Sequence, residues 1–341
     1  MIHTREECTG FTVRPMTLED ADIVIDLINT AALAGTGMVG TNRSEQLNEW
    51  GLPQFNMETD TRLVFEPGGR LVGYAELWDT RPHVRHYLAE HVHPDYQGLG
   101  IGRDLIAWAE ERARRSLDKA PPDASVVLAS IWAHENARAR DLYQAHGFVL
   151  ARRFFRMRID MQAGEPPPDP VWPQGIRVRP YLFGQDDRAV HQLMDQAFQD
   201  HWGYVEGESL EEWLHWLEHD PTFDPSLCFL ALAGSHQLVG ALMARPQWEV
   251  DPSVAWIDEI GVLRPWRHRG IGLALLRQSL AEFHRRGIYK VGLGVDGESL
   301  TGATRLYECA GMRVFQQRDA YEKTLLPGKD RTTRTLEEDR S

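Results

Sequence analysis

A short glycine-rich segment occurs twice in this chain of 341 residues and has the composition of a phosphate-binding turn. The first copy covers residues 97–102, QGLGIG, and the second covers residues 267–272, RHRGIG. We call them cradle 1 and cradle 2. Glycines let the backbone approach a phosphate closely, and the first N–H groups of a helix attract an anion. Glycines in one such turn could serve packing alone, so the interpretation depends on what surrounds the two copies.

Each cradle lies between an expected strand and an expected helix. Cradle 1 follows an apolar run that ends at Val92, and cradle 2 follows one that ends at Val262. After each cradle, apolar residues recur at helical spacing. This order of strand, glycine-rich turn and helix N-terminus predicts two pyrophosphate-binding sites.

The repetition extends well beyond the cradles. Three further markers recur in the same order, about 165 residues apart: VRP at 13–15 and 178–180, LVG at 71–73 and 238–240, and LY at 142–143 and 306–307. A period of this length indicates a duplicated domain, because solenoid repeats are roughly 20 to 50 residues long.

The two halves share one expected α/β architecture, a mixed β-sheet flanked by helices. We predict an N-terminal domain at 1–162, a proline-rich linker at 163–175, a C-terminal domain at 176–327 and a disordered, polar tail at 328–341. A chain of this length can bury two separate cores.

The net charge, the cysteines and the apolar runs limit which partners and which cellular compartment we expect. The net charge of −13 argues against nucleic acid as a partner. Three widely spaced cysteines, Cys8, Cys228 and Cys309, favour reduced thiols over a disulfide framework. With no apolar run near 18 residues and no signal-like start, we expect a cytoplasmic protein without a membrane span.

The motifs resemble those of the GNAT superfamily of acyl-CoA-dependent N-acetyltransferases. The signature of that family is Arg or Gln, two residues, Gly, one residue, then Gly or Ala, and both cradles match it. A second family element, an Asn followed by a Leu-Tyr pair, is present at Asn136 and Tyr143. The second half keeps Tyr307 but has Ser299 or Leu300 at the Asn position, which puts one cofactor contact there in doubt.

The resemblance covers nearly the whole chain and implies tandem GNAT-like domains that use acetyl-CoA as a co-substrate, without a metal. It implies an N-acetyltransferase in which a primary amine of a small metabolite, antibiotic or peptide attacks the thioester directly. The residues that it implies in cofactor binding are Val92, Gln97, Gly98, Gly100, Gly102 and Asn136 in the first half, and Ile260, Val262, Arg267, His268, Arg269, Gly270 and Gly272 in the second.

The family chemistry also implies a proton donor and a base. Tyr143 and Tyr307 are the expected donors to the departing thiolate, although either could be a core aromatic. Strand alternation back from the two valines places Glu90 and Asp258 on matching faces, whereas Glu259 lies on the opposite face unless a β-bulge re-aims it. These three carboxylates are the candidate bases, with His86 or a water chain as alternatives.

Acceptor selection is expected from the variable segment after the first helix of each half. In the second half this segment contains Trp202 and Tyr204 among other aromatic and acidic residues, which suits a cationic amine, although the aromatic residues could equally be core. A cluster of four histidines at 83–93 lacks cysteine and is not expected to bind metal. The chain could be a monomer or a homodimer. A different function also fits, in which the cradles only sense acyl-CoA.

Overall fold

The computed structural model describes residues 10–234 and 236–334. The chain forms two compact units, which we describe separately. Unit 1 consists of the residues up to Ala151 together with Asp319–Arg331. Unit 2 consists of Arg152–Arg318 and the residues from Thr332 onward. The predicted linker at 163–175 thus lies within unit 2, and each unit contains a strand segment from the other half of the sequence.

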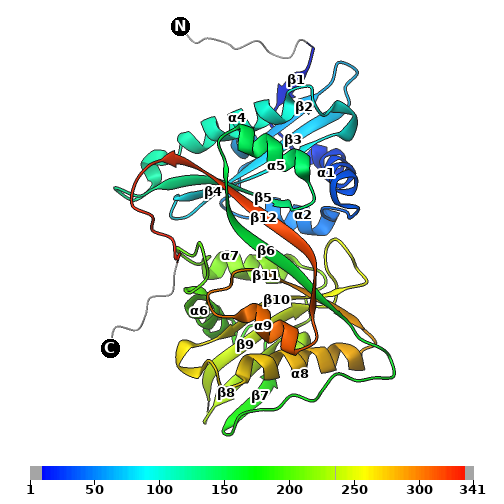
Figure 1. The fold of residues 1–341 in the computed structure, drawn as a ribbon, viewed down its shortest axis with the longest axis vertical. Coiled ribbons are helices and arrows are strands. Elements are labelled where there is room, and N and C mark those ends of the chain that lie inside the picture. The colour runs from blue at the N-terminus through cyan, green and yellow to red at the C-terminus, as the bar shows by residue number, and fades with distance from the viewer. Residues whose placement is uncertain (1–9, 235, 335–341) are drawn as a thin grey trace. The chain divides into compact units, whose positions relative to one another are not determined.

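Unit 1 contains one sheet with the strand order β1-β2-β3-β4-β5-β12 (Figure 1). The pairs from β1 to β4 are antiparallel, and β4 pairs with β5 in parallel. The predicted mixed sheet flanked by helices is confirmed. Its elements are β1 (Thr12–Arg14), α1 (Ala21–Thr36), α2 (Arg43–Trp50), α3 (Met57–Asp60), β2 (Thr61–Phe65), β3 (Leu71–Thr80), β4 (Arg85–Val92), α4 (Ile101–Arg114), β5 (Val126–Ala133), α5 (Ala137–Ala145) and the second part of β12 (Arg313–Leu326).

Unit 2 repeats this plan with the strand order β6-β11-β10-β9-β8-β7. Here β10 and β11 pair in parallel. The pairs β6–β11, β10–β9, β9–β8 and β8–β7 are antiparallel. The elements are β6 (Val149–Asp160), β7 (Ile176–Pro180), α6 (Asp187–Phe198), α7 (Leu210–His219), β8 (Phe229–Ala233), β9 (Gln237–Arg245), β10 (Ala255–Val262), α8 (Ile271–Arg285), β11 (Lys290–Asp296) and α9 (Ala303–Cys309).

Each sheet is covered on both faces, as the alternation along its strands requires. In unit 1, Leu71 belongs to the core cluster of α1, whereas its neighbour Val72 belongs to the cluster of α4. In unit 2, Leu242 packs in the cluster of α8 and Met243 in that of α6. The helix that follows each cradle is therefore held against one face of its sheet.

The repeated VRP motif fastens the first strand of each half to the start of the next helix. Arg14 donates two hydrogen bonds to Asp20, at 2.7 and 2.6 Å, and Arg179 donates two to Asp186, at 2.6 and 2.8 Å. Each arginine also donates to the carbonyl of the adjacent proline at 3.0 Å. The motif recurs because the same bidentate ion pair is built twice.

The repeated LVG motif has a steric cause. A Cβ on Gly73 would lie 2.7 Å from Ile101, the first residue of α4. On Gly240 it would lie 3.3 Å from Ile271, the first residue of α8, and 3.1 Å from a backbone oxygen. Glycine at these positions lets the beginning of each cradle helix lie directly on the sheet.

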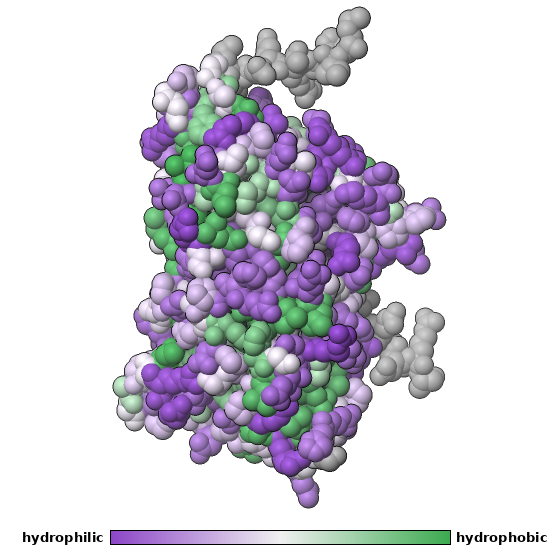
Figure 2. Space-filling view, turned by 180° about the vertical axis from the view of Figure 1, so that it is seen from behind, coloured by the Kyte–Doolittle hydropathy of each residue, from purple (hydrophilic) through white to green (hydrophobic). Residues whose placement is uncertain are grey.

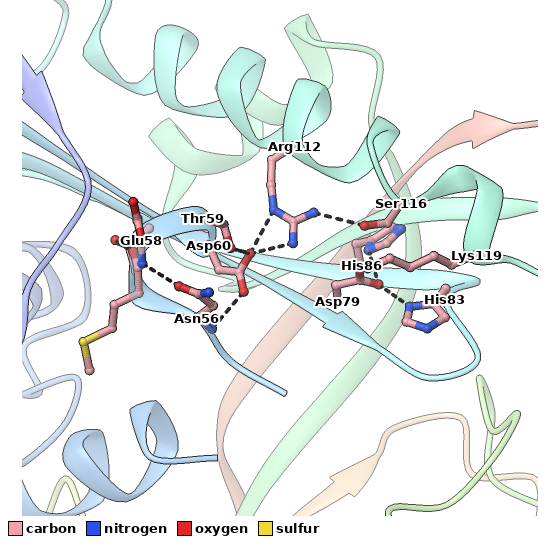
Figure 3. Close-up of polar contacts among 12 residues, drawn as sticks. Asn56, Glu58, Thr59, Asp60, Asp79, His83, His86, Arg112, Ser116 and Lys119 are labelled. Atoms are coloured by element: carbon pink, nitrogen blue, oxygen red, sulfur yellow. Dashed lines mark hydrogen bonds and ion pairs between the residues drawn. The ribbon is translucent and has the colours of Figure 1, made fainter. Parts of the chain in front are cut away.

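A polar network in unit 1 accounts for several of the clustered histidines (Figure 3). Asp79 lies 2.7 Å from His83 Nδ1 and 3.2 Å from His86 Nδ1, and Asp60 accepts from Arg112 at 2.8 Å. Although burial alone would raise the pKa of Asp79, hydrogen bonds from groups that include both histidines hold it well below its usual range. His86, an alternative base, is completely buried in this network.

The surface face in Figure 2 shows hydrophobic residues in separate groups among hydrophilic ones. Within the described residues, no helix is long and apolar enough to cross a membrane. Cys228 is buried and Cys309 exposed, and both are free thiols, whereas Cys8 lies outside the described residues.

The first part of the predicted disordered tail makes backbone contacts. Lys329 donates to the carbonyl of Asp123 at 2.6 Å, and Thr333 donates to that of Tyr204 at 2.8 Å. Residues 335–341 of that prediction lie outside the described residues.

Candidate functional site

The two cradles have nearly the same backbone. Each follows a 3₁₀ turn, Pro94–Tyr96 or Arg264–Trp266, and contains the glycine that caps the next helix. Gly100 and Gly270 occupy these cap positions with φ of 89° and 87°, which is costly for any side-chain-bearing residue. Both arrangements direct the first N–H groups of a long helix toward the loop, as an anion site requires.

The last glycine of each cradle is required for close packing against the helix that carries the tyrosine. A Cβ on Gly102 would lie 3.0 Å from Leu142 Cδ2, and one on Gly272 would lie 2.9 Å from Leu306 Cδ1. The leucine of each Leu-Tyr pair therefore rests on the cradle helix. This contact fixes the distance between cradle and tyrosine.

A cavity of about 290 Å³ in unit 2 joins cradle 2 to α9. It lies where β10 and β11 separate: these strands pair only from Ala255 to Ile257, and residues beyond that point on both strands line the cavity. Eight predicted residues line it, namely Asp258, Ile260, Val262, Arg267, His268, Gly270, Gly272 and Tyr307. An anion-binding helix start at one end of a mostly apolar channel fits the pyrophosphate and acyl arm of acetyl-CoA.

A β-bulge in β10 affects only one of the two carboxylates. Ile257 pairs with Ala244 and Glu259 pairs with Met243, so Asp258 is an extra residue without a partner on β9. The pairs from Glu259 to Val262 are regular, so Glu259 stays on the face opposite Val262, as alternation predicts, and the bulge displaces Asp258 instead of re-aiming Glu259. Asp258 lines the 290 Å³ cavity, and Glu259 lines a second cavity.

The second cavity, of about 160 Å³, lies on the α6 and α7 side of Glu259. Besides Glu259, its lining includes Glu208, Asp195, Tyr204 and Trp213, and Phe198 lines both cavities. Its carboxylates and aromatic faces suit a cationic amine. We call it the acceptor cavity.

Burial raises the pKa of all three carboxylates near the bulge. Desolvation, with smaller contributions from Glu208 and Asp258, raises the pKa of Glu259 to about 8. Desolvation and Glu212 raise that of Glu208 to about 7. For Asp258, desolvation prevails over the nearby Arg245, and the pKa rises to about 6.

Asp258 and Glu259 differ in their partners. Arg245 donates to Asp258 at 2.9 Å, and 32% of the Asp258 side chain remains accessible. Within the described part of the chain, no salt bridge involves Glu259. Glu259 is thus the carboxylate whose charge is not already balanced by a cation.

Tyr307 completes the wall of the larger cavity. The residue is 9% exposed, and burial raises the pKa of its phenol to about 12. The hydroxyl therefore stays protonated at neutral pH and can donate.

The candidate base and the tyrosine of unit 1 are more completely enclosed. Glu90 is 3% exposed and Tyr143 is 0% exposed. Burial raises the pKa of both groups well above the ordinary values, and in Tyr143 the charge of Glu90 adds to this effect. Asn136 uses its side-chain oxygen to cap α5 through the N–H of Ala139 at 3.1 Å, and Ser299 accepts from the Ala303 N–H at 3.2 Å in unit 2.

The remaining predicted residues lie outside the cavity walls. Arg269 stacks its guanidinium over Trp266, with 4.8 Å between the guanidinium carbon and the ring centroid. Trp202 lies beside the guanidinium of Arg334, 4.6 Å away, and it is Tyr204 of the predicted pair that lines the acceptor cavity. In cradle 1, Gln97 accepts a hydrogen bond from Arg138.

Two residues of the site were not singled out from the sequence: Glu208 and Arg245. Glu208 lies between α6 and α7, next to the helix cap Ser209, and no sequence signal distinguishes it from other exposed acids. Arg245 reaches Asp258 only through strand pairing. For metals, the described residues contain no group of three or more potential ligands.

Comparisons with known proteins match a family model to each half of the chain. The model "Acetyltransferase (GNAT) family" matches residues 188–312, and "Acetyltransferase (GNAT) domain" matches residues 58–150. The chain is 32% identical to a mycothiol acetyltransferase of Thermobispora bispora, over 73% of this chain and 79% of that protein. It is 30% identical to one of Streptomyces coelicolor, over 92% and 94%.

Solved structures show the same fold. A GCN5-related N-acetyltransferase from Sphaerobacter thermophilus superposes with a TM-score of 0.78 and 32% identity, over 96% of this chain and 99% of that one. A tandem GNAT protein from the clavulanic acid biosynthesis pathway superposes with a TM-score of 0.70 over 94% of this chain and 100% of that one; at 16% identity it supports the fold alone.

Proposed function

Because the chain belongs to the GNAT acetyltransferase family and is an acetyl-CoA-dependent N-acetyltransferase that acts on an amine, we propose that unit 2 holds the catalytic site and that Glu259 is its general base. The observation that supports this proposal is that Glu259 lines the acceptor cavity, which shares Phe198 with the cavity that Tyr307 lines.

Proton transfer favours a carboxylate with a raised pKa. A lysine-like ammonium has a pKa of about 10.4, so transfer to an ordinary glutamate at about 4.3 is uphill by roughly 6 units. Transfer to Glu259, with a pKa of about 8, is uphill by much less. An incoming cation also favours the ionised form of Glu259, because opposite charges attract.

The proposed reaction balances with two protein groups. Glu259 removes one proton from the ammonium of the acceptor, and the nitrogen lone pair attacks the thioester carbonyl carbon. The carbon–sulfur bond breaks, and Tyr307 donates a proton to the sulfur. The attached nitrogen then gives its surplus proton to the Tyr307 phenolate and becomes the amide. The proton that Glu259 took leaves to solvent, so each turnover releases one proton. We assign the backbone N–H of Val262 to the carbonyl oxygen, where a fixed dipole stabilises developing negative charge. Cradle 2 would hold the pyrophosphate of acetyl-CoA.

Asp258 has a different role in this scheme. Its carboxylate is paired with Arg245 at 2.9 Å and faces the acetyl-CoA cavity. We assign it to shaping that cavity and to raising the pKa of Glu259 through its charge.

The acceptor class follows from the size and charge of its cavity. About 160 Å³ lined by three carboxylates suits the end of a small molecule or peptide that carries a primary amine. Amines of the kind that mycothiol acetyltransferases use belong in the first substrate panel. We expect the enzyme to act in the cytoplasm, where acetyl-CoA is available and free thiols persist.

The pH dependence of kcat/KM tests the base. With Glu259 as base, kcat/KM should rise with pH through an apparent pKa near 8, because the carboxylate must be ionised to accept a proton. Glu259→Gln should abolish this rise and lower kcat/KM by about 10²-fold or more. Asp258→Asn serves as the matched control and should keep the rise, shifted to lower pH. A rise near pH 6 that disappears in Asp258→Asn would assign the base to Asp258 instead.

A further inference from the structure

Asp200, in the loop after α6, joins two arginines of the cradle 2 segment. The residue is 2% exposed. Its carboxylate accepts a hydrogen bond from Arg264 Nε at 2.8 Å and another from Arg267 Nη1 at 2.5 Å. Burial alone would raise its pKa, but the two guanidiniums together hold the pKa below the usual range, so the group is a carboxylate at neutral pH.

Arg267 is the first residue of cradle 2, and its side chain is turned into the protein. Its Nε donates to the carbonyl of Val262 at 3.0 Å, and its Nη2 donates to the carbonyl of Ala197 at 2.9 Å. Three of its donors are thus occupied by the end of β10, the last turn of α6 and Asp200. The guanidinium fixes the position of the cradle instead of reaching out for a phosphate.

The loop that carries Asp200 leads directly to the acceptor cavity. Asp200 and His201 line the larger cavity, and Tyr204, three residues after His201, lines the acceptor cavity. Tyr204 is itself fixed by a hydrogen bond of 2.7 Å from its hydroxyl to Asp195. The Asp200 carboxylate therefore connects cradle 2 to the loop that lines the acceptor cavity.

We propose that Asp200 is a positioning residue that holds cradle 2 at the correct distance from Val262 and from the acceptor loop at 199–204. This inference rests on the proposed use of cradle 2 by acetyl-CoA. This ion pair between Asp200 and the first cradle residue is found in unit 2 and not in unit 1. Cradle 1 has Gln97 in place of Arg267, and Gln97 contacts Arg138. A neutral first residue needs no buried counter-ion.

Removal of the charge of Asp200 gives the primary test. Asp200→Asn leaves Arg267, whose side chain is only 19% exposed, without its counter-ion. Breaking one partner of such a pair is costly because the other charge stays buried. We expect the KM for acetyl-CoA to rise by at least about tenfold. Calorimetry with acetyl-CoA alone should show an equal loss of affinity at one binding site.

A second substitution separates positioning from simple loss of folding. Arg267→Gln gives cradle 2 the first residue of cradle 1 and removes the unpaired charge. The double variant Asp200→Asn, Arg267→Gln should therefore have a KM for acetyl-CoA within about threefold of Arg267→Gln alone, because the buried imbalance is gone. In these variants the Arg264 guanidinium stays solvated by water, since 48% of its side chain is exposed.

The chain supplies a matched control at the other end of the same helix. Asp186→Asn breaks the bidentate pair with Arg179 at the start of α6, outside the lining of both cavities. Asp186→Asn should lower the midpoint of thermal unfolding but leave the KM for acetyl-CoA and the KM for the acceptor amine unchanged.

Two results would overturn the proposal: an Asp200→Asn protein whose KM for acetyl-CoA stays within twofold of wild type, or effects of Asp200→Asn and Arg267→Gln that simply multiply in the double variant. Failure of the proposed base is a separate outcome. It would appear as an active Glu259→Gln protein, and it would leave the calorimetric comparison at Asp200 intact.

Discussion

Units 1 and 2 build the same cradle on the same kind of sheet and differ at one strand. In unit 1, β4 keeps a regular register with β3 from Val92 to Arg85. In unit 2, the corresponding strand β10 contains one extra residue, Asp258. The regular strand leaves Glu90 only 3% exposed, whereas Asp258 on the bulged strand faces a cavity with 32% of its side chain accessible. A single bulge thus accompanies the change from an enclosed carboxylate to accessible ones.

The tyrosines follow the same contrast. Tyr307 lines the 290 Å³ cavity, whereas Tyr143 is 0% exposed and packs edge-on against Phe148, with 4.8 Å between ring centroids. The two units therefore share the cradle signature and differ in how completely the tyrosine is enclosed.

The largest expected difference between the units is in the rate. Tyr307→Phe should lower kcat by about 10²-fold, because the departing sulfur loses its proton donor, while the Kd for acetyl-CoA changes little. Tyr143→Phe should change kcat by less than about twofold. Steady-state kinetics together with calorimetry measure both effects. Equal losses in the two variants would mean that both units catalyse.

A smaller difference is expected in stability. The pKa of Glu90 is raised in the folded protein, so its ionisation costs stability once the pH exceeds the unfolded value of about 4.5. Glu90→Gln should therefore raise the free energy of unfolding at pH 7 by about 1 to 2 kcal/mol, and the gain should vanish as the pH falls toward 4. Urea unfolding at several pH values measures this change.

The activity of the glutamine variants also distinguishes the two units. Glu90→Gln should leave kcat/KM within about twofold of wild type, whereas Glu259→Gln should combine greater stability at neutral pH with a large loss of activity. A Glu90→Gln protein that is stable but inactive would contradict the assignment of catalysis to unit 2.

The smallest expected effect concerns the second residue of each cradle. Gly98 has φ of 81° and His268 has φ of 58°, so a side chain occupies the left-handed region only in cradle 2. Gly98→Ala should destabilise the protein by about 1 kcal/mol, since no atom lies within 4 Å of the added Cβ and only the backbone is strained. His268→Gly should stabilise it by about 0.5 kcal/mol, because relief of strain exceeds the added chain entropy. Thermal unfolding measures both, and opposite signs would contradict this account of the cradle.

Much of the local structure could be predicted from the sequence because its causes are short-range. Gly100 and Gly270 cap helices at positive φ, and a glycine-rich turn before a helical run predicts that conformation. The recurrence of VRP, LVG and LY at similar spacing predicted two copies of one fold, and the family comparisons and the structure confirm it. The roles of the individual site residues remain predictions that the proposed variants test.

Other features depend on contacts between segments that are distant in the sequence. Strand β12 completes the sheet of unit 1, although it is the last strand of the second repeat. The bulge at Asp258 exists only relative to the register of β9, whereas the face that Glu259 takes follows from alternation with Val262.

Asp200 shows the same limit, because it is separated by more than sixty residues from the arginines that it holds. Local backbone requirements made the two cradles and the duplicated fold predictable, and the resemblance of the motifs to the GNAT family implied the cofactor. Strand register and long-range ion pairs determined which carboxylates reach a cavity, because burial and pairing arise only when distant segments pack together.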